Sequence, residues 1–391
     1  MRYPIAMPRP QCLPVVIAWL LVTAAAGTRA QRQYDWNLPS SFPIPVVPAD
    51  NPMSAEKVEL GRYLFYDVRL SGNGTQSCAT CHHQERAFTD GLAQSIGSTG
   101  QVHTRGSMSL ANVAYAAVLT RANPTLTRLE DQALVPMYGD HPVEMGLDRS
   151  DEWLFMFRRD PVYVDLFKPA FPGAADPVTR GNLVKALASF ERSIISARSP
   201  YDRYHFGGDG TAISAAAKRG EALFFSRSLS CSSCHGGFNF SGAVATASAP
   251  KAKVEFHNTG LHSLPGLLSY PGRDAGLYEV TKDPKDIGKF KAPTLRNIAL
   301  TAPYMHNGSI ATLEEAVAHD RAGDRTAQEG AYAGVGRGSP NGRGRTRGFT
   351  LTDAERRDLV AFLESLTDKE LLLDLRFDNP WRRLIPGSEG W

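Results

Sequence analysis

The sequence predicts a mainly α-helical protein made of two similar halves, with long loops and few short strands. Two observations indicate this fold class. The pattern Cys-x-x-Cys-His occurs twice, at residues 78–82 and 231–235, and each copy follows a helix-forming segment that carries a glycine. Apolar residues recur at helical spacing over residues 179–197 and 352–366, whereas strand-like alternation is rare and Pro and Gly are frequent between the helices.

The segment ahead of each Cys-x-x-Cys-His pattern is expected to belong to a pair of closely packed helices. Residues 57–65 contain Gly61, and residues 218–224 contain Gly220. Since glycine has no side chain, a second helix can approach each position closely. Together with the repeated pattern, this similarity predicts an internal duplication. The expected domains are a leader over residues 1–30, an N-terminal half over 31–205 and a C-terminal half over 206–391.

The first thirty residues have the composition of a secretory signal peptide. Arg2 and Arg9 precede a largely apolar run, and Ala30 supplies the small residue at which cleavage is expected. A membrane anchor is the alternative, but the run is shorter than the ~20 residues that a membrane span needs. We therefore expect an exported, periplasmic protein without a membrane anchor.

The composition of the chain argues against two other classes of protein. With 42% hydrophobic residues, the chain can fill a core, which argues against disorder as its main state. Without residues 1–30 it has 40 basic and 40 acidic residues, so we expect no binding to nucleic acid.

The four cysteines outside the leader carry the strongest signal. In an exported protein they would ordinarily pair as disulfides, but here they stand as Cys78 with Cys81 and Cys231 with Cys234, and His82 and His235 follow at once. Two thiols one helical turn apart can add to the two vinyl groups of a haem, and the next imidazole can then bind the iron. A zinc site or a redox-active thiol pair leaves both histidines without a role. The sequence therefore predicts two covalently bound c-type haems.

Over essentially its whole mature length, the chain resembles the bacterial di-haem cytochrome c peroxidases and their relative MauG. Within that family it is most similar to the methanobactin-operon di-haem enzymes (MbnH type), on residues 105–110 and 256–260. The family motifs are the two haem patterns, Leu-Ser-Gly-Asn-Gly at 70–74, Phe-Thr-Asp-Gly at 88–91, Pro-Val-Glu-Met-Gly at 142–146, Pro-Thr-Leu-Arg-Asn at 293–297 and Thr-Ala-Pro-Tyr-Met-His-Asn-Gly at 301–308.

The resemblance implies that peroxide reacts in the first half. It places Glu144 over the first haem, with Gln132 and Pro136 in the same pocket. A sheltered carboxyl suits a group that moves a proton between the two peroxide oxygens. Family members that need prior reduction have a histidine ligand where this chain has Ser98, so we expect the first iron to be bound by His82 and open on its other side. The alternative is that the nearby His103 folds inward.

The resemblance makes the second haem, held by Cys231, Cys234 and His235, an electron relay. Relatives give its iron a Met or Tyr as sixth ligand, at the position of Asp320. Either Asp320 or His319 is then expected to bind, or the iron stays five-coordinate.

Two further positions differ from the family. The aromatic residue that relatives place between the haems falls at or next to Arg121. The calcium ion that relatives bind through carbonyls near Thr301 and Pro303 also uses an Asn side chain, and that position is Gly106 here. Calcium is therefore a further expectation from the resemblance alone.

Three functions follow from these observations. The leading hypothesis is a peroxide-dependent oxidoreductase that oxidises a protein side chain, Trp in the subgroup, on an exported partner protein. The second is a cytochrome c peroxidase that reduces hydrogen peroxide with electrons from a small cytochrome c or cupredoxin. The third is a di-haem electron carrier without catalysis.

Overall fold

The computed structural model describes residues 34–262, 270–271, 274–323, 326–327, 334–335, 339, 341 and 348–384. The expected leader lies outside these residues. From Tyr34 onward the described chain forms one compact unit, and the expected division of the chain near residue 205 stays a prediction.

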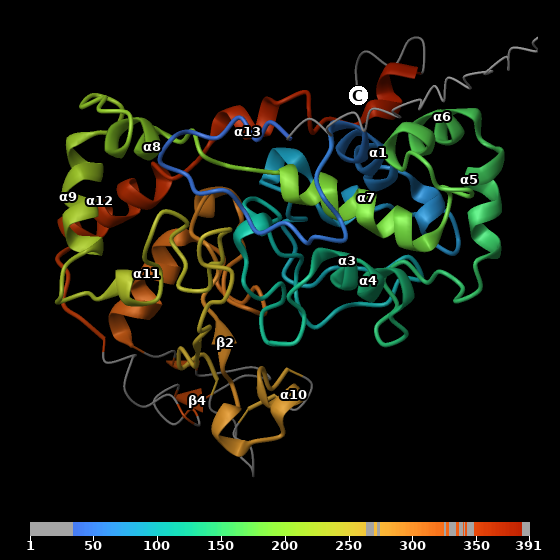
Figure 1. Cartoon of the computed structure of the whole chain (residues 1–391). Helices are drawn as coiled ribbons and strands as arrows, with labels where there is room; N and C mark the ends of the chain where they lie inside the picture. Colours follow the sequence, from blue (N-terminus) through green and yellow to red (C-terminus); the bar gives the residue numbers. More distant parts are fainter. Residues whose placement is uncertain are drawn as a thin grey trace, which may run out of the picture. The chain divides into compact units, whose positions relative to one another are not determined.

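The fold is mainly helical, as the sequence predicted. The strands are short and form two antiparallel pairs, β1 (Phe256–His257) with β2 (Phe290–Lys291) and β3 (Thr326–Ala327) with β4 (Gly334–Val335). The helices, which Figure 1 labels where there is room, are α1 (Ala55–Phe65), α2 (Cys78–Cys81), α3 (Leu129–Gln132), α4 (Leu134–Tyr138), α5 (Phe155–Arg159), α6 (Pro161–Ala170), α7 (Arg180–Ser193), α8 (Pro200–His205), α9 (Ala215–Phe224), α10 (Tyr278–Thr281), α11 (Leu313–Ala322), α12 (Asp353–Glu364) and α13 (Lys369–Leu373).

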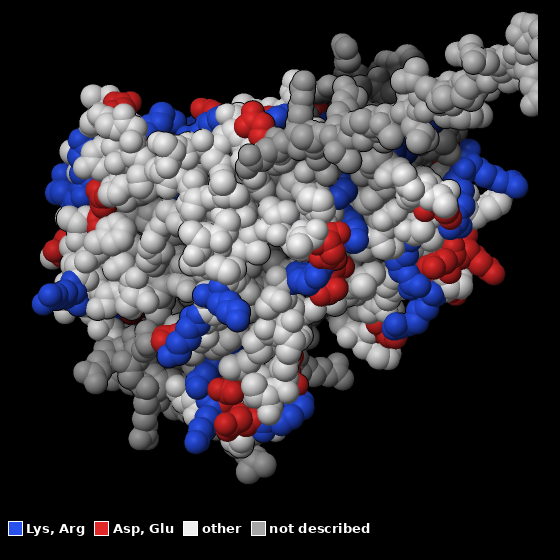
Figure 2. Space-filling model, in the orientation of Figure 1, with Lys and Arg blue, Asp and Glu red and all other residues white. Residues whose placement is uncertain are grey.

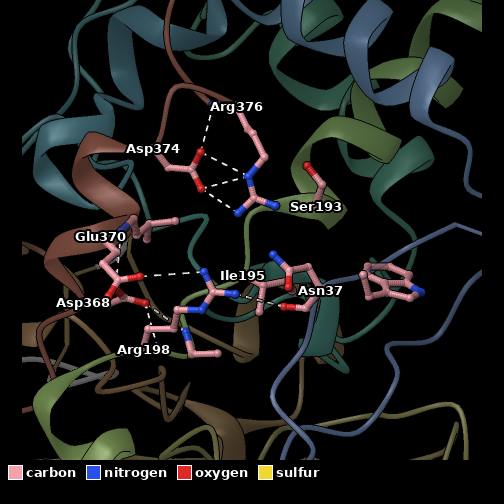
Figure 3. A pocket seen from close by; sticks show the side chains of 11 residues that line it. Asn37, Ser193, Ile195, Arg198, Asp368, Glu370, Asp374 and Arg376 are labelled. Atoms are coloured by element: carbon pink, nitrogen blue, oxygen red, sulfur yellow. Dashed lines mark hydrogen bonds and ion pairs between the residues drawn. The ribbon is translucent and has the colours of Figure 1, made fainter.

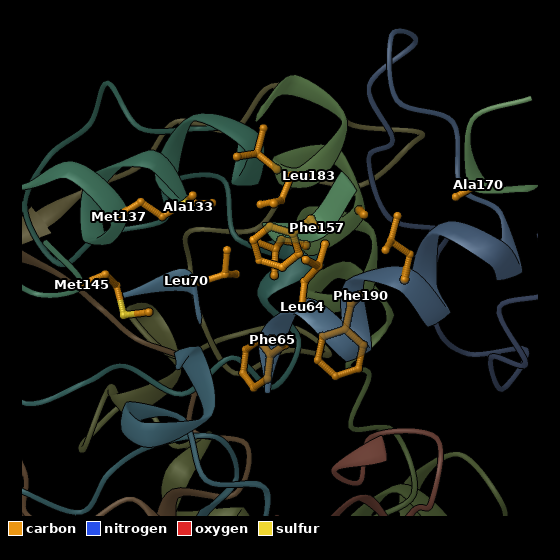
Figure 4. Close-up of a cluster of buried hydrophobic side chains, with 14 of the residues drawn as sticks. Leu64, Phe65, Leu70, Ala133, Met137, Met145, Phe157, Ala170, Leu183 and Phe190 are labelled. Atoms are coloured by element: carbon orange, nitrogen blue, oxygen red, sulfur yellow. The ribbon is translucent and has the colours of Figure 1, made fainter. Parts of the chain in front are cut away.

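In the first half, α1 packs directly against α7. A Cβ at Gly61 would collide with the carbonyl oxygen of Ala186, so the glycine allows this close approach. The rings of Phe65 and Phe190 lie 5.1 Å apart between the two helices, in the core that Figure 4 shows. Burial of this apolar core supplies the main driving force for the helix pair.

In the second half, α9 packs against α12 in the same way, and the two lie side by side in Figure 1. A Cβ at Gly220 would collide with the carbonyl oxygen of Asp358. Helix α12 begins with a capping box, in which the Thr352 hydroxyl accepts from the Glu355 amide at 3.2 Å and the Glu355 carboxylate accepts from the Thr352 amide at 2.8 Å.

The internal duplication is visible in two asparagines that occupy matching places. Asn112 and Asn297 both have φ 61°, a left-handed conformation that Asn tolerates better than most residues, and each precedes a short 3-10 turn. The Asn112 side chain accepts from the Ser196 amide at 2.7 Å, just after α7. The Asn297 side chain accepts from the Asp368 amide at 2.8 Å, just after α12. In both halves, an asparagine side chain therefore holds the backbone just after the long helix.

The same residues join the two halves through a buried polar junction. The Asn112 amide donates to the Asn239 side chain at 3.0 Å, and the Asn297 amide donates to the Ser196 hydroxyl at 3.0 Å. The Asp368 carboxylate accepts from the backbone amide of Ala197 at 3.0 Å. Buried polar groups lose free energy when a partner is removed, so this junction fixes the two halves against each other.

Among the described helices, none is long and apolar enough to cross a membrane. On the face shown in Figure 2, charged side chains of both signs lie over the middle and at the edges, with uncharged surface between them. This face therefore carries no extended patch of one sign.

The two helix pairs give the first testable prediction. Gly61→Ala or Gly220→Ala should lower the free energy of unfolding by about 1–3 kcal/mol, because the added methyl group meets a backbone carbonyl that cannot move independently. Thermal unfolding followed by circular dichroism measures the loss. Gly181→Ala, on the open side of α7 with no atom near the added methyl group, is the matched control and should be neutral or stabilising. Equal effects in all three variants would contradict close packing at Gly61 and Gly220.

Candidate active site

The first Cys-x-x-Cys-His pattern forms one helical turn, α2, which ends in the histidine. The Ser77 amide donates to the Thr80 hydroxyl at 3.0 Å and so closes the start of the turn. At its end, the His82 amide donates to the Cys78 carbonyl at 3.1 Å. Cys78 and Cys81 are half-buried and form no disulfide. Their thiols are thus available for thioether bonds.

The His82 ring is held in the tautomer that an iron ligand needs. Its Nδ1–H donates to the Phe88 carbonyl at 2.8 Å, and a carbonyl only accepts, so Nε2 carries the free lone pair. Burial lowers the pKa of His82, which favours the neutral imidazole. Phe88 is fully buried at φ 63°, within a tight loop in which its amide donates to the His83 carbonyl at 2.8 Å.

The second pattern repeats this arrangement. The His235 amide donates to the Cys231 carbonyl at 3.0 Å, and the His235 Nδ1–H lies 3.1 Å from the Pro293 carbonyl and 3.4 Å from the Phe240 carbonyl. Burial lowers the pKa of His235 as well. Cys231 and Cys234 are half-buried and unpaired.

The thiol environment fits haem attachment better than the two alternatives. Burial raises the pKa of Cys81 and of Cys231 to about 12, whereas zinc ligands and redox-active cysteines need thiolates. No cluster of His, Cys, Asp and Glu that could hold a metal ion occurs among the described residues. The two patterns therefore have free thiols and neutral, oriented histidines, as two c-type haems require.

Glu144 lies near the first Cys-x-x-Cys-His turn, in the N-terminal half. Its backbone carbonyl accepts from the Ser98 amide at 2.7 Å, and the next amide, of Met145, donates to the Pro136 carbonyl at 2.9 Å. Burial is the main cause of the raised pKa of Cys78 and Cys81, and the charge of Glu144 is a smaller cause in both. The Glu144 carboxyl therefore lies near α2. Desolvation by the surrounding protein raises the pKa of Glu144 to about 7, while 41% of its side chain stays accessible.

The Pro136 carbonyl therefore lies beside the residue that follows Glu144, and Gln132 lies one turn earlier, at the end of α3. Both side chains are half-buried. A reachable carboxyl whose pKa is close to neutral can both accept and return a proton.

His103 is the residue whose position the sequence left open. The structure places its Nδ1 3.9 Å from a Glu144 carboxyl oxygen, with only 16% of the side chain exposed. Its Nε2 is buried and has no hydrogen-bond partner among the described residues. Burial lowers the pKa of His103, so a neutral imidazole stands beside the carboxyl. Sequence spacing could not show this contact, because His103 and Glu144 come from different loops.

Comparisons with known proteins show which family the chain is similar to. A family model described as di-haem cytochrome c peroxidase matches residues 55–210, and one described as cytochrome c matches residues 217–367. A cytochrome-c peroxidase, IdrP1, of Denitromonas iodatirespirans is 37% identical over 90% of this chain and 93% of its own. The methylamine utilization protein MauG of Methylorubrum extorquens is 32% identical over 90% of this chain and 95% of its own.

The chain belongs to the di-haem cytochrome c peroxidase and MauG family. It is a peroxidase-type oxidoreductase with two c-type haems, as the sequence predicted. Among solved structures, that of a MauG-like protein associated with microbial copper homeostasis is 45% identical, with a TM-score of 0.86, and the match covers 89% of this chain and all of that one.

At the second haem site of this family member, α11 brings Asp320 toward the haem-binding turn. Burial is the largest influence on the pKa of His235 and of Cys231, and the charge of Asp320 is the second. The Asp320 charge raises the pKa of both groups. His319 donates through Nε2–H to the Thr259 carbonyl at 2.9 Å. Its other ring nitrogen is buried without a partner in the described chain.

The residues at the expected calcium position do not fit a calcium ion. A Cβ at Gly106 would collide with the Leu92 carbonyl oxygen, so no ligating side chain can replace this glycine without movement. The Gly106 carbonyl accepts from the Arg121 guanidinium at 3.2 Å, which places a positive charge there. The carbonyls of Thr301 and Pro303 therefore lack the side-chain oxygen that the resemblance pairs with them.

A separate pocket of about 200 Å³ lies between the end of α7 and α13 (Figure 3). It is lined by the ion pairs of Arg198 with Glu370 at 3.7 Å and Arg376 with Asp374 at 2.6 Å. Neither haem-attachment residues nor Glu144 line it, so it is not the peroxide site.

The position and pKa of Glu144 predict how the enzyme reacts with peroxide. The carboxylate form accepts the proton, so the rate constant of the peroxide reaction should rise with pH through about 7 and then level off. Glu144→Gln should be at least ~100-fold slower and lose this pH dependence. Stopped-flow absorbance of the Soret band measures both.

The matched control for this experiment is Glu85→Gln, which removes a 73% exposed carboxyl from the same half of the chain. It should keep the parent rate and pH profile. An unchanged rate in Glu144→Gln would exclude the carboxyl as the proton carrier.

Proposed function

We propose that this enzyme uses hydrogen peroxide to oxidise a side chain, tryptophan, on a separate exported protein. One observation carries the proposal: the chain is 45% identical, over all of that chain's length, to a MauG-like protein associated with microbial copper homeostasis. The family motifs over residues 105–110 and 256–260 support the same subgroup. The partner is then an exported protein of copper homeostasis, and both proteins work in the periplasm.

Different residues of the first half have different roles in peroxide reduction. When bound, the haems supply redox-active irons, one to react with peroxide and one to exchange electrons. His82 would hold the first iron through Nε2, because its Nδ1–H is oriented by the Phe88 carbonyl. Glu144 would take the proton from one peroxide oxygen and return it to the other, which then leaves as water. Gln132 and Pro136 shape the pocket around it.

His103 completes the pocket as a neutral neighbour of Glu144. Burial disfavours the charged form of His103, and desolvation of Glu144 itself keeps the pKa of that carboxyl near neutral. Over a full cycle, two electrons from the partner and two protons convert one hydrogen peroxide into two waters.

The test is a direct assay on candidate partners. The exported proteins encoded beside this chain are incubated with the di-haem enzyme and hydrogen peroxide, and tryptophan oxidation is located by peptide mass spectrometry. We expect oxidation at one Trp with the parent enzyme and none with Glu144→Gln or without enzyme. Oxidation at similar levels in all three reactions would mean that free peroxide, and not the enzyme, is responsible.

The second candidate function is that of a cytochrome c peroxidase. It is favoured by the 37% identity to cytochrome-c peroxidase IdrP1 over 93% of that protein. Here the electrons come from a small cytochrome c or cupredoxin. Rapid peroxide-dependent oxidation of a reduced small cytochrome, with no oxidised Trp on any candidate partner, would support this function instead. A non-catalytic electron carrier would react with neither.

We also propose Asp320 as the sixth ligand of the second iron. Replacing it by Met offers a thioether, which favours the reduced iron, so the midpoint potential of one haem should rise. Spectroelectrochemical titration measures the shift. His319→Gln is the matched control on the same helix, because His319 donates to Thr259, and it should leave both potentials near the parent values. A change in the control alone would make His319 the ligand.

A further inference from the structure

Two neighbouring cations between the haem sites have no carboxylate partner. Arg121 donates to the Gly106 carbonyl at 3.2 Å, and Lys291 donates through Nζ to the Val118 carbonyl at 2.9 Å. In the part of the chain that the structure describes, neither side chain makes an ion pair. Backbone carbonyls are neutral, so the two positive charges stay unbalanced.

The two cations are close together, and Lys291 is buried while Arg121 is half-buried. The Lys291 amide donates to the Arg121 carbonyl at 2.8 Å, and only 8% of Lys291 is exposed. Burial, with the neighbouring Arg121 charge, lowers the pKa of Lys291 to about 8. Burying two like charges is costly unless an anion compensates them.

Two acids act on Arg121, Asp274 and Asp90, and other groups engage both of them. The Asp90 carboxylate accepts from the Leu92 amide at 3.0 Å and from the Ser95 hydroxyl. Asp274 accepts from the Arg105 guanidinium at 2.7 Å and lies 3.1 Å from the His306 ring. Its charge therefore balances Arg105 and His306, and among the described residues no carboxylate is left to pair with Arg121 and Lys291.

Each cation is tied by short contacts to one haem-binding turn. Gly106, which accepts from Arg121, precedes Ser107, whose hydroxyl donates to the Cys81 carbonyl at 2.6 Å. Lys291 lies two residues before Pro293, whose carbonyl orients His235. The pair therefore lies between the first and the second haem site.

We propose that Arg121 and Lys291 form a clamp for haem propionates, with carboxylates from the two haems meeting at this pair. A guanidinium matches a carboxylate with two parallel hydrogen bonds, and an ammonium adds a point charge. Since Arg121 stands at or next to the position of an aromatic residue in relatives, a charged contact here replaces a ring between the haems. The inference rests on the two-haem site of the proposed function, not on the identity of the partner.

The test is a spectroelectrochemical titration of the full di-haem protein. Removing a positive charge beside a propionate favours the ferric form, so Arg121→Gln and Lys291→Gln should each lower at least one haem potential. We expect about a tenfold change in the reduction equilibrium, which is ~59 mV for one electron. Lys253→Gln removes a 90% exposed cation and is the control, expected to leave both potentials unchanged. Peroxide turnover is not needed, so this clamp and the proposed function can fail separately.

A second variant keeps the proposal testable if the Gln variants lose haem. Arg121→Lys keeps the charge and loses the paired donors, so its potentials should stay near the parent values while the propionate-bending band in resonance Raman spectra shifts. Parent-like potentials in both Gln variants with two haems bound would overturn the proposal, as would an unshifted band in Arg121→Lys. Potentials of the parent protein that vary with chloride concentration would overturn it in favour of a soluble anion, because a propionate is part of the haem.

Discussion

The hydrogen bond from His82 Nδ1 to the Phe88 carbonyl is the interaction on which the first site depends. It decides which ring nitrogen is free, and it holds the ring at a fixed angle beside the two thiols. The bond exists only because the chain turns back at once, with Phe88 buried in a left-handed conformation. The second half reaches the same result with Phe240 and Pro293, so the duplicated unit is the histidine together with the loop that orients it.

The helix pairs give these loops a rigid support. Gly61 and Gly220 allow α1 and α9 to pack closely on α7 and α12, and Asn112 and Asn297 then hold the segments that follow those long helices. Because the two asparagines also bond across the junction, the distance between the haem sites is set by the core of both halves. Electron exchange over a fixed distance needs such a frame.

Local patterns allowed much of this to be predicted from the sequence. Cysteine spacing gave the haem sites, helical periodicity and two glycines gave the helix pairs, and a family motif gave Glu144. Contacts between distant segments could not be predicted from the sequence. The approach of His103 to Glu144 and of Arg121 to Lys291 depends on how loops from different parts of the chain pack, and no local spacing encodes that. The space at Gly106, which the Leu92 carbonyl limits, likewise depends on the packing of another segment.

Charge is distributed unevenly along the path that electrons and protons take. At the first site, burial shifts the pKa of His82, of His103 and of Glu144 toward the uncharged form. In the proposed peroxide site, uncharged groups suit hydrogen peroxide, which is itself neutral, and a carboxyl near its pKa can release a proton as readily as it takes one up. Positive charge is concentrated instead on Arg121 and Lys291, between the haem sites. Negative propionates there would neutralise the cations and leave the charge of the peroxide pocket unchanged, so proton transfer and electron transfer can be tuned by separate residues.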